Sequence, residues 1–273
     1  MTPEVKRILK RQRLGRPLQS RDLQLTHARI QDRHVIFCTD MEHDPIQRNH
    51  RRGDFYEGKE LNGLKKLFPK GGTFVDIGAN VGNHSLFAAL FLEAGRVLPI
   101  EPNPLAYRLL VQNVLVNGLE KVFDLSKLGV GLSDADAGGF AMEERTRNLG
   151  GAKMLSGKGE LQVYRGDVLF ADETPDMIKI DVEGMEMAVL AGLKAVIGKH
   201  KPVLLVEVDN QNEDAFMVWA KDAGYDVIET VQRYRLNKNH LLTPKKQTAS
   251  KAKTKAKAKP RKTAKKPTRA KAA

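Results

Sequence analysis

The stretch from Gly71 to Ser85 constrains the fold more than any other part of this 273-residue chain. It reads GGTFVDIGANVGNHS, in which the apolar run 74–77 passes through Gly78 and Gly82 into an apolar helical pattern. A strand, glycine-rich loop and helix start can cradle a small molecule, because glycines admit close backbone approach and helix N–H groups meet polar ligand atoms. The same pattern also serves a plain tight turn, so the surrounding sequence has to decide.

Strand-like and helix-like segments alternate along the rest of the chain. Strands are predicted over 34–39, 74–77, 96–100, 122–132, 161–164, 177–182, 202–208, 225–231 and 233–236, with a hairpin turn at 136–139 before residues 140–142. Helices are predicted over 57–68, 85–94, 105–117, 183–197 and 214–223, and residues 40–52 read as a polar connection. This alternation predicts an α/β fold with a doubly wound, mostly parallel sheet and helices on both faces.

Charge divides the chain into three parts: a basic arm at 1–22, a folded domain at 23–244 and a tail at 245–273. The net charge of +13 is concentrated in the tail, which holds eleven Lys, two Arg and no acid, whereas residues 23–244 carry 26 basic and 31 acidic residues. The tail consists mostly of Lys, Ala, Thr and Pro and has no aromatic side chain and no aliphatic one larger than Ala to bury, so we expect it to be disordered. It resembles the tails of histone-like proteins, which implies non-specific contact with nucleic-acid phosphates; a merely solubilising tail is the alternative.

The basic arm contains apolar residues at helical spacing, so a short amphipathic helix is predicted there, docked on the body rather than on a membrane. No segment is long enough to span a bilayer or to serve as a signal peptide. The single cysteine, Cys38, is expected in packing and suits a reducing, cytoplasmic compartment. We expect no metal site, because His34, His43 and His50 lack the tight spacing of a ligand set.

Polar residues follow several predicted strands at the edge where a parallel sheet binds its ligands. Glu101 lies 23 residues after Gly78, the spacing at which an acid accepts hydrogen bonds from ribose hydroxyls, so a nucleoside is indicated. Asn80 and Asn83 stand where a dinucleotide fingerprint needs glycine, which argues against NAD and FAD. S-adenosylmethionine has a nucleoside without phosphate and fits this pattern, and Asp76 can organise the loop around its methionine end or tie down the turn.

Four sequence blocks together resemble the FkbM family of S-adenosylmethionine-dependent methyltransferases. They are VDIGANVGNHS at 75–85, IEPNP at 100–104, IKIDVEGME at 178–186 and LLVEV at 204–208, and the match runs from about Asp54 to Pro244. The resemblance implies a Rossmann-like class I methyltransferase fold and methylation of hydroxyl groups on sugars or polyketide-derived metabolites. By this analogy the cofactor contacts fall on Gly78, Ala79, Asn80, Gly82, Asn83, Ser85, Glu101, Asn103, Ser133 and Asp134.

Methyl transfer to a hydroxyl needs alignment of acceptor and methyl and a base for the hydroxyl proton. Asp181 is the first candidate base, because it ends the fourth strand at the ligand edge. Lys179 shares its face and is either part of the site or half of a buried ion pair. Glu183 can be a site acid or a helix-start acid, and Glu207 can face the substrate or solvent.

Two other functions remain open. The chain can be a nucleic-acid-associated protein that uses a methyltransferase fold as a scaffold, or a methyltransferase whose tail recruits a nucleic-acid or protein substrate. The combination of Gly78, Gly82 and Glu101 favours the enzyme, because a scaffold needs none of them. Methylation of a base amine is disfavoured, because the fourth strand ends in Asp-Val-Glu-Gly rather than in an Asn/Asp-Pro-Pro-aromatic block.

Overall fold

A computed structural model describes residues 2–20, 22–145 and 147–245. The tail expected to be disordered, 245–273, lies outside the described residues except for Lys245. Among the described helices, none combines the length and the apolar character that a bilayer crossing requires.

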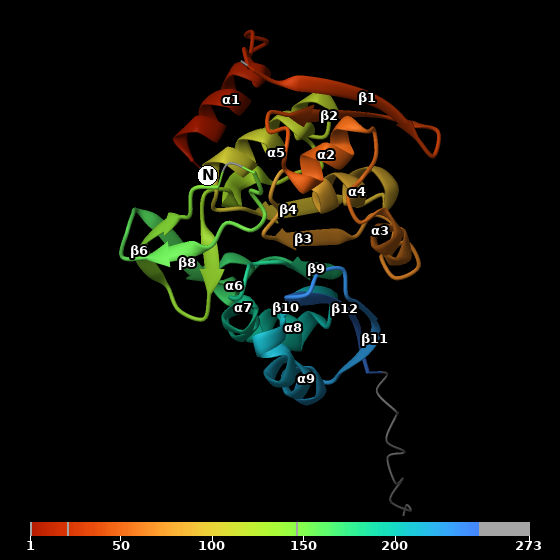
Figure 1. Ribbon diagram of the computed structural model, residues 1–273, viewed down its shortest axis with the longest axis vertical. Helices are drawn as coiled ribbons and strands as arrows, with labels where there is room; N and C mark the ends of the chain where they lie inside the picture. Colours follow the sequence, from red (N-terminus) through yellow and green to blue (C-terminus); the bar gives the residue numbers. More distant parts are fainter. Residues whose placement is uncertain (1, 21, 146, 246–273) are drawn as a thin grey trace, which may run out of the picture.

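A six-stranded sheet forms the centre of the molecule (Figure 1). Its strand order is β11-β12-β10-β9-β3-β4, in which the last four strands are parallel and β12 runs antiparallel to both neighbours. The strands are β3 (Thr73–Ile77), β4 (Arg96–Ile100), β9 (Met177–Ile180), β10 (Val203–Asp209), β11 (Tyr225–Val231) and β12 (Asn237–Pro244). The expected doubly wound, mostly parallel sheet is confirmed.

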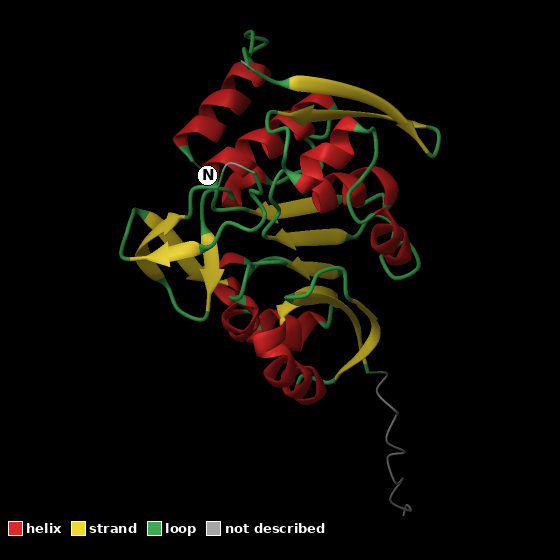
Figure 2. Cartoon of the chain, viewed as in Figure 1, coloured by secondary structure: helices red, strands yellow, loops and turns green. Residues whose placement is uncertain are grey.

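Helices cover both faces of this sheet, because its strands are apolar on both sides. On β3, Phe74 packs into the core under α4 (Asn83–Phe91) and α5 (Pro104–Val116), whereas Val75 packs into the opposite core. The second core is closed by α7 (Glu186–Gly192), α8 (Lys194–His200) and α9 (Glu213–Asp222), and α3 (Gly58–Leu64) borders the first. Figure 2 shows these helices on either side of the strands.

A separate four-stranded sheet lies beside the carboxyl end of β4 and contains β5 (Gly131–Ser133), β8 (Leu161–Arg165), β6 (Ala137–Met142) and β7 (Met154–Ser156). The strand predicted over 122–132 is therefore wrong as a member of the central sheet. Only Phe123 reaches that sheet, through a single bridge to Val97, before the short helix η1 (Leu125–Lys127) turns the chain away.

Backbone geometry explains two other differences from the expected elements. The helix predicted over 183–197 begins only at Glu186, because Glu183 and Gly184 adopt positive φ angles of 48° and 91°. It is interrupted at Leu193, where α8 begins. The strand predicted over 233–236 is a loop, and pairing starts at Asn237.

The N-terminal part contains a predicted and an unpredicted element. The expected amphipathic helix is α1 (Pro3–Arg13), with Val5 buried in the core. β1 (Gln24–Ile30) was not expected and forms a hairpin with β2 (Arg33–Thr39), while the polar connection 40–52 contains α2 (Pro45–Arg51). The remaining short helices are α6 (Gly166–Leu169) and η2 (Asn210–Asn212).

Candidate active site

The loop between β3 and α4 is packed tightly against the loop after β9. Gly78 has a φ of +74°, and a Cβ atom there would lie 1.7 Å from the carbonyl oxygen of Asp181. Gly82 has a φ of +89°, and a Cβ atom there would lie 3.0 Å from Leu110. Gly78 is thus required where the ends of β3 and β9 come together, and Gly82 is favoured by its positive φ where the loop packs on α5.

Lys179 holds this junction together from within the sheet. Its ammonium is buried, donates to the carbonyl oxygen of Gly78 at 2.7 Å, and lies 3.4 Å from Asp76 and 3.3 Å from Asp181. Asp76 in turn accepts a 2.6 Å hydrogen bond from Ser85 on α4. Burial by itself lowers the pKa of Lys179, but the charges of Asp181 and Asp76 outweigh it and raise that pKa above its usual value.

Glu101 ends β4 with a buried carboxylate. Oε2 accepts a 2.7 Å hydrogen bond from the backbone N–H of Asn80, and Oε1 accepts one of 2.8 Å from that of Asn103. Burial raises the pKa of Glu101 to about 7, against the lowering effect of these two N–H groups. Each carboxylate oxygen keeps a second lone pair with which to accept a ligand hydroxyl.

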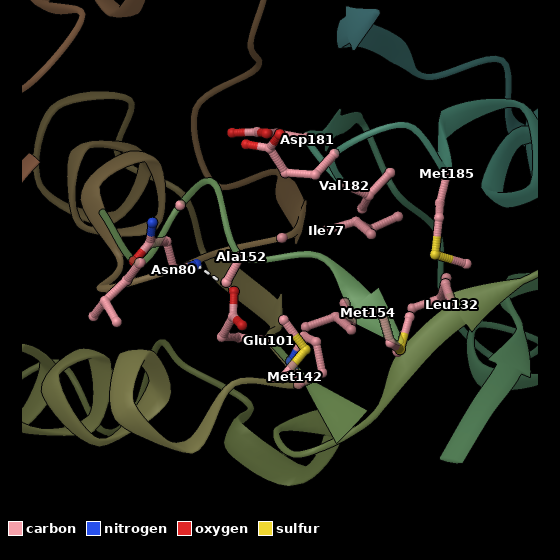
Figure 3. A pocket seen from close by; sticks show the side chains of 17 residues that line it. Ile77, Asn80, Glu101, Leu132, Met142, Ala152, Met154, Asp181, Val182 and Met185 are labelled. Atoms are coloured by element: carbon pink, nitrogen blue, oxygen red, sulfur yellow. Dashed lines mark hydrogen bonds between the residues drawn. The ribbon is translucent and has the colours of Figure 1, made fainter. Parts of the chain in front are cut away.

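A narrow inner cavity begins at Glu101 and has an apolar far wall (Figure 3). That wall is formed by Leu132 on β5, Met142 on β6 and Met154 on β7, all in the four-stranded sheet. Asn80 stands at the other side of the cavity, with Oδ1 buried and without a hydrogen-bond partner among the described residues. The inner cavity thus combines hydrogen-bonding groups with an apolar surface.

A wider outer cavity of about 630 Å³ adjoins the inner one. The two cavities share Asn80, Gly150, Asp181 and Glu183, which we call the junction. The outer cavity is lined mainly by polar and aromatic side chains, among them Tyr56, Glu57, Asn148, Lys153, Gln211 and Tyr234.

The two junction carboxylates, Asp181 and Glu183, lie close to a third, Glu207, which lines the outer cavity. One oxygen each of Asp181, Glu183 and Glu207 lies within 4.8 Å of the others, and all three residues are half-buried. Burial, reinforced by the charges of Asp181 and Asp209, raises the pKa of Glu183 to about 7. Burial together with the charges of Asp181, Glu183 and Glu57 raises the pKa of Glu207 to about 9, although Oε1 of Glu207 also accepts a 2.6 Å hydrogen bond from Asn237.

Glu207→Gln should make the folded protein more stable at alkaline pH. The folded state keeps protons on Glu183 and Glu207 that the unfolded chain has released above pH 4.5, so these groups lower the free energy of unfolding as pH rises from about 5 to about 9. We expect the variant to gain on the order of 1 kcal/mol over the wild type at pH 9 and little at pH 5, measured by urea unfolding. An equal difference at both pH values would contradict the raised pKa.

The loop from Glu143 to Lys153 closes part of both cavities and was not among the residues expected in the site. Asp44, fully buried at the start of α2, fastens it: Oδ1 accepts from the N–H of Gln47 and Oδ2 from that of Leu149, both at 2.9 Å. This contact links residues that are 105 positions apart, so no local spacing in the sequence could have indicated it.

Asp44→Ala should loosen this loop. Removal of both acceptors leaves two buried N–H groups unpaired, which costs about 1 to 3 kcal/mol each. We expect limited trypsin digestion to cut after Arg145 and Lys153 at least tenfold faster than in the wild type. The exposed Asp172→Ala is the matched control, and unchanged cleavage in Asp44→Ala would show that the loop is held by other contacts.

The outer cavity is also bordered by a second set of residues that the sequence analysis did not predict in the site. The hydroxyls of Tyr56 and Tyr234 lie 2.5 Å apart, and the Arg233 guanidinium lies 5.2 Å from the centre of the Tyr56 ring. Asn83 positions this segment, because Oδ1 of Asn83 accepts from the N–H of Tyr56 at 3.0 Å and contacts His50 at 3.1 Å. The polar run 40–57 gave no helical or strand period from which these contacts could be read.

The residues predicted from the sequence to form the site fall into two groups in the structure. Those that line a cavity are Gly78, Asn80, Glu101, Asp181, Glu183 and Glu207. Those that lie behind or beside the cavity walls are Asp76, Ala79, Gly82, Asn83, Ser85, Asn103, Ser133, Asp134 and Lys179. Ser133 and Asp134 belong to the end of β5 and its turn, and Gly131 and Leu132 reach the inner cavity instead.

The sheet order and the cavity at the carboxyl ends of β3, β4 and β9 define a class I methyltransferase with a Rossmann-like fold. The model of the methyltransferase FkbM domain matches residues 76–235, so the chain belongs to the FkbM methyltransferase family. A comparison with curated proteins gave no significant match.

Solved structures of methyltransferases resemble the chain at low sequence identity. The M. jannaschii tRNA m1G37 methyltransferase is 16% identical, with 84% of this chain and 59% of that one covered and a TM-score of 0.49. An rRNA methylase from Streptococcus thermophilus is 11% identical, with 69% and 96% covered and a TM-score of 0.46. Methyltransferase FkbM from Methylobacillus flagellatus KT is 17% identical, with 67% and 51% covered and a TM-score of 0.43.

Proposed function

We propose that the protein is an S-adenosylmethionine-dependent O-methyltransferase acting on a hydroxyl of a sugar or another small metabolite. The observation that carries this proposal is that the two cavities adjoin, because the narrow inner cavity that contains Glu101 meets a wider polar cavity beside three carboxylates. Donor and acceptor can thus meet at a place that offers groups to take a proton.

The inner cavity fits the methyl donor in three respects. Glu101 has free lone pairs for ribose hydroxyls, and Leu132, Met142 and Met154 offer an apolar surface for adenine (Figure 3). The unpartnered Oδ1 of Asn80 is a buried acceptor that the polar methionine end of the donor can satisfy. S-adenosylmethionine would supply an electrophilic methyl group on a sulfonium.

In the proposed proton transfer, Glu183, Glu207 and Lys179 have different roles. The hydroxyl proton of the acceptor would pass to Glu183, whose pKa of about 7 suits a base at neutral pH, while the bound donor would supply the methyl group to the acceptor oxygen. Glu207, with a pKa of about 9, is protonated there and can donate a hydrogen bond to the acceptor. Lys179 remains charged and holds Asp181 in place beside them.

The charge of the outer cavity supports a small polar acceptor. Five acids line it, Glu57, Asp181, Glu183, Glu207 and Asp209, and even with Glu207 protonated the others outnumber the two cations, Arg145 and Lys153. A phosphodiester backbone would be repelled from such a wall. Hydroxyl groups of a sugar, in contrast, can hydrogen-bond to the carboxylates while its ring packs on Tyr56 and Tyr234.

Two measurements test this function. Isothermal titration calorimetry should detect binding of S-adenosylmethionine to the wild-type protein, and absence of binding would sink the enzyme hypothesis. Incubation with methyl-labelled donor and fractionated cell extract should place the label in a small-molecule or glycan fraction. Label only in nucleic acid or protein would favour the alternative in which the basic tail, 245–273, recruits a macromolecular substrate.

A further inference from the structure

Helix α1 has two sharply different sides. Val5, Ile8 and Leu9, at helical spacing, pack against the first core, and Gln12 on the same side donates a hydrogen bond to Glu120. Thr2 caps the helix, since its hydroxyl accepts from the N–H of Val5 at 3.3 Å. The helix is therefore docked on the body in a fixed orientation, at the top of the view in Figure 1.

The outer side of α1 carries cations that the body does not neutralise. Its exposed cationic side chains are Lys6, Arg7, Lys10, Arg11 and Arg13, and we call them the α1 cations. Within residues 2–20, 22–145 and 147–245, none of them lies within ion-pair distance of a carboxylate, and Arg11 instead donates to the carbonyl oxygen of Pro17 at 2.7 Å.

The α1 cations are distinguished by their density, because five of them lie between positions 6 and 13. Many exposed cations elsewhere in the described residues are also unpaired but are less densely clustered, and others are neutralised by carboxylates. Arg96, for example, lies 2.9 Å from Asp124 and 2.8 Å from Glu173, and Lys238 lies 3.2 Å from Glu213. The α1 cations thus produce a local positive field on a domain whose net charge is negative. Along the helix, cations four positions apart recur about every 6 Å, which makes a short row of charge.

We propose that the α1 cations bind the phosphodiester backbone of a nucleic acid, and that this contact is separate from methyl transfer. A row of unpaired Lys and Arg side chains suits a chain with one negative charge per nucleotide, because each contact releases a condensed counterion. An anionic membrane fits less well, because Val5, Ile8 and Leu9 are turned into the protein and cannot insert among lipids.

The outer cavity does not suit a nucleic-acid backbone, because its wall is acidic. The contact therefore holds the protein on a nucleic acid without presenting a phosphate to the methyl donor. The inference does not depend on the proposed O-methylation, since it rests on the charge and orientation of α1 alone. Twelve of the thirteen cations of residues 245–273 lie outside the described residues, and they would add to the same contact.

A charge-matched pair of full-length variants tests the proposal. In the first, Lys6→Gln, Lys10→Gln and Arg13→Gln remove three α1 cations. In the second, Lys66→Gln, Lys194→Gln and Lys199→Gln remove three exposed cations near α3 and on α8, on other sides of the molecule. Binding to fluorescently labelled oligo(U) and oligo(dT) is followed by anisotropy between 50 and 200 mM salt, alongside thermal unfolding and S-adenosylhomocysteine binding.

We expect the α1 variant to weaken binding at least tenfold at 50 mM salt and to reduce the slope of log K against log salt by about 2 for single strands. The second variant should stay within a factor of two to three of the wild type, and both should unfold and bind S-adenosylhomocysteine as the wild type does. Equal losses in both variants, or no loss in either, would overturn the proposal. Stronger α1-dependent binding to phosphatidylserine vesicles than to either oligonucleotide would also overturn it in favour of a membrane.

Discussion

Glu101→Gln should lower the affinity for S-adenosylhomocysteine at least about 100-fold. Hydrogen bonds to a charged carboxylate contribute about 1.5 to 3 kcal/mol each, and Glu101 has a free lone pair on each oxygen for the two ribose hydroxyls. The amide adds a second loss, because its NH₂ group would face the backbone N–H of either Asn80 or Asn103. Calorimetry at pH 8 measures the effect.

The pH dependence of the same affinity provides an independent check. Because burial raises the pKa of Glu101 to about 7 in the free protein, protonation below pH 7 removes the charged acceptor. Affinity of the wild type should therefore fall by up to about tenfold per pH unit below 7, and the Glu101→Gln variant should show no such slope. The exposed Glu160→Gln is the matched control, and near wild-type affinity in Glu101→Gln would remove Glu101 from the donor site.

Lys179→Met should destabilise the folded protein by about 3 to 5 kcal/mol, because the buried carboxylate of Asp76 and that of Asp181 lose their shared counter-charge. For a domain of this size the loss corresponds to a fall in melting temperature of roughly 10 °C. Differential scanning calorimetry measures it, with the exposed Lys199→Met as the matched control.

A double variant separates loss of the ion pair from loss of packing. Adding Asp76→Asn to Lys179→Met removes one stranded charge, so we expect the double variant to recover a good part of the lost stability. If Asp76→Asn instead adds its full cost to that of Lys179→Met, the two residues do not interact and the ion-pair interpretation fails.

The central sheet could be predicted because local patterns determine it. The apolar run 97–100 and the helical pattern of 105–117 have short-range signatures, and the FkbM blocks supplied their order. The second sheet could not, because its strands are short and half-exposed and pair across long connections. The run 122–132 reads as one strand, yet η1 divides it and sends only Gly131–Ser133 into that sheet.

The residues around the inner cavity, which we propose for the donor, could be singled out for the same reason, whereas most of those around the outer cavity could not. Gly78 and Glu101 belong to contiguous motifs, although Gly78 turns out to accommodate the backbone of Asp181. The contacts of Asp44 with Leu149 and of Tyr56 with Tyr234 span 105 and 178 positions, and no periodicity in the sequence marks them. Asp181, Glu183 and Glu207 fall between the two cases. The sequence analysis placed each of them near the end of a strand but could not give the distances between them.

A crystal structure of the protein with S-adenosylhomocysteine tests the central claim most directly. We predict density for the ligand in the inner cavity, with ribose hydroxyls on Glu101, adenine against Met142 and Met154, and the sulfur facing the junction of Asp181 and Glu183. Density for the ligand in another place, or an inner cavity without ligand in crystals grown at saturating concentration, would contradict the assignment of this site.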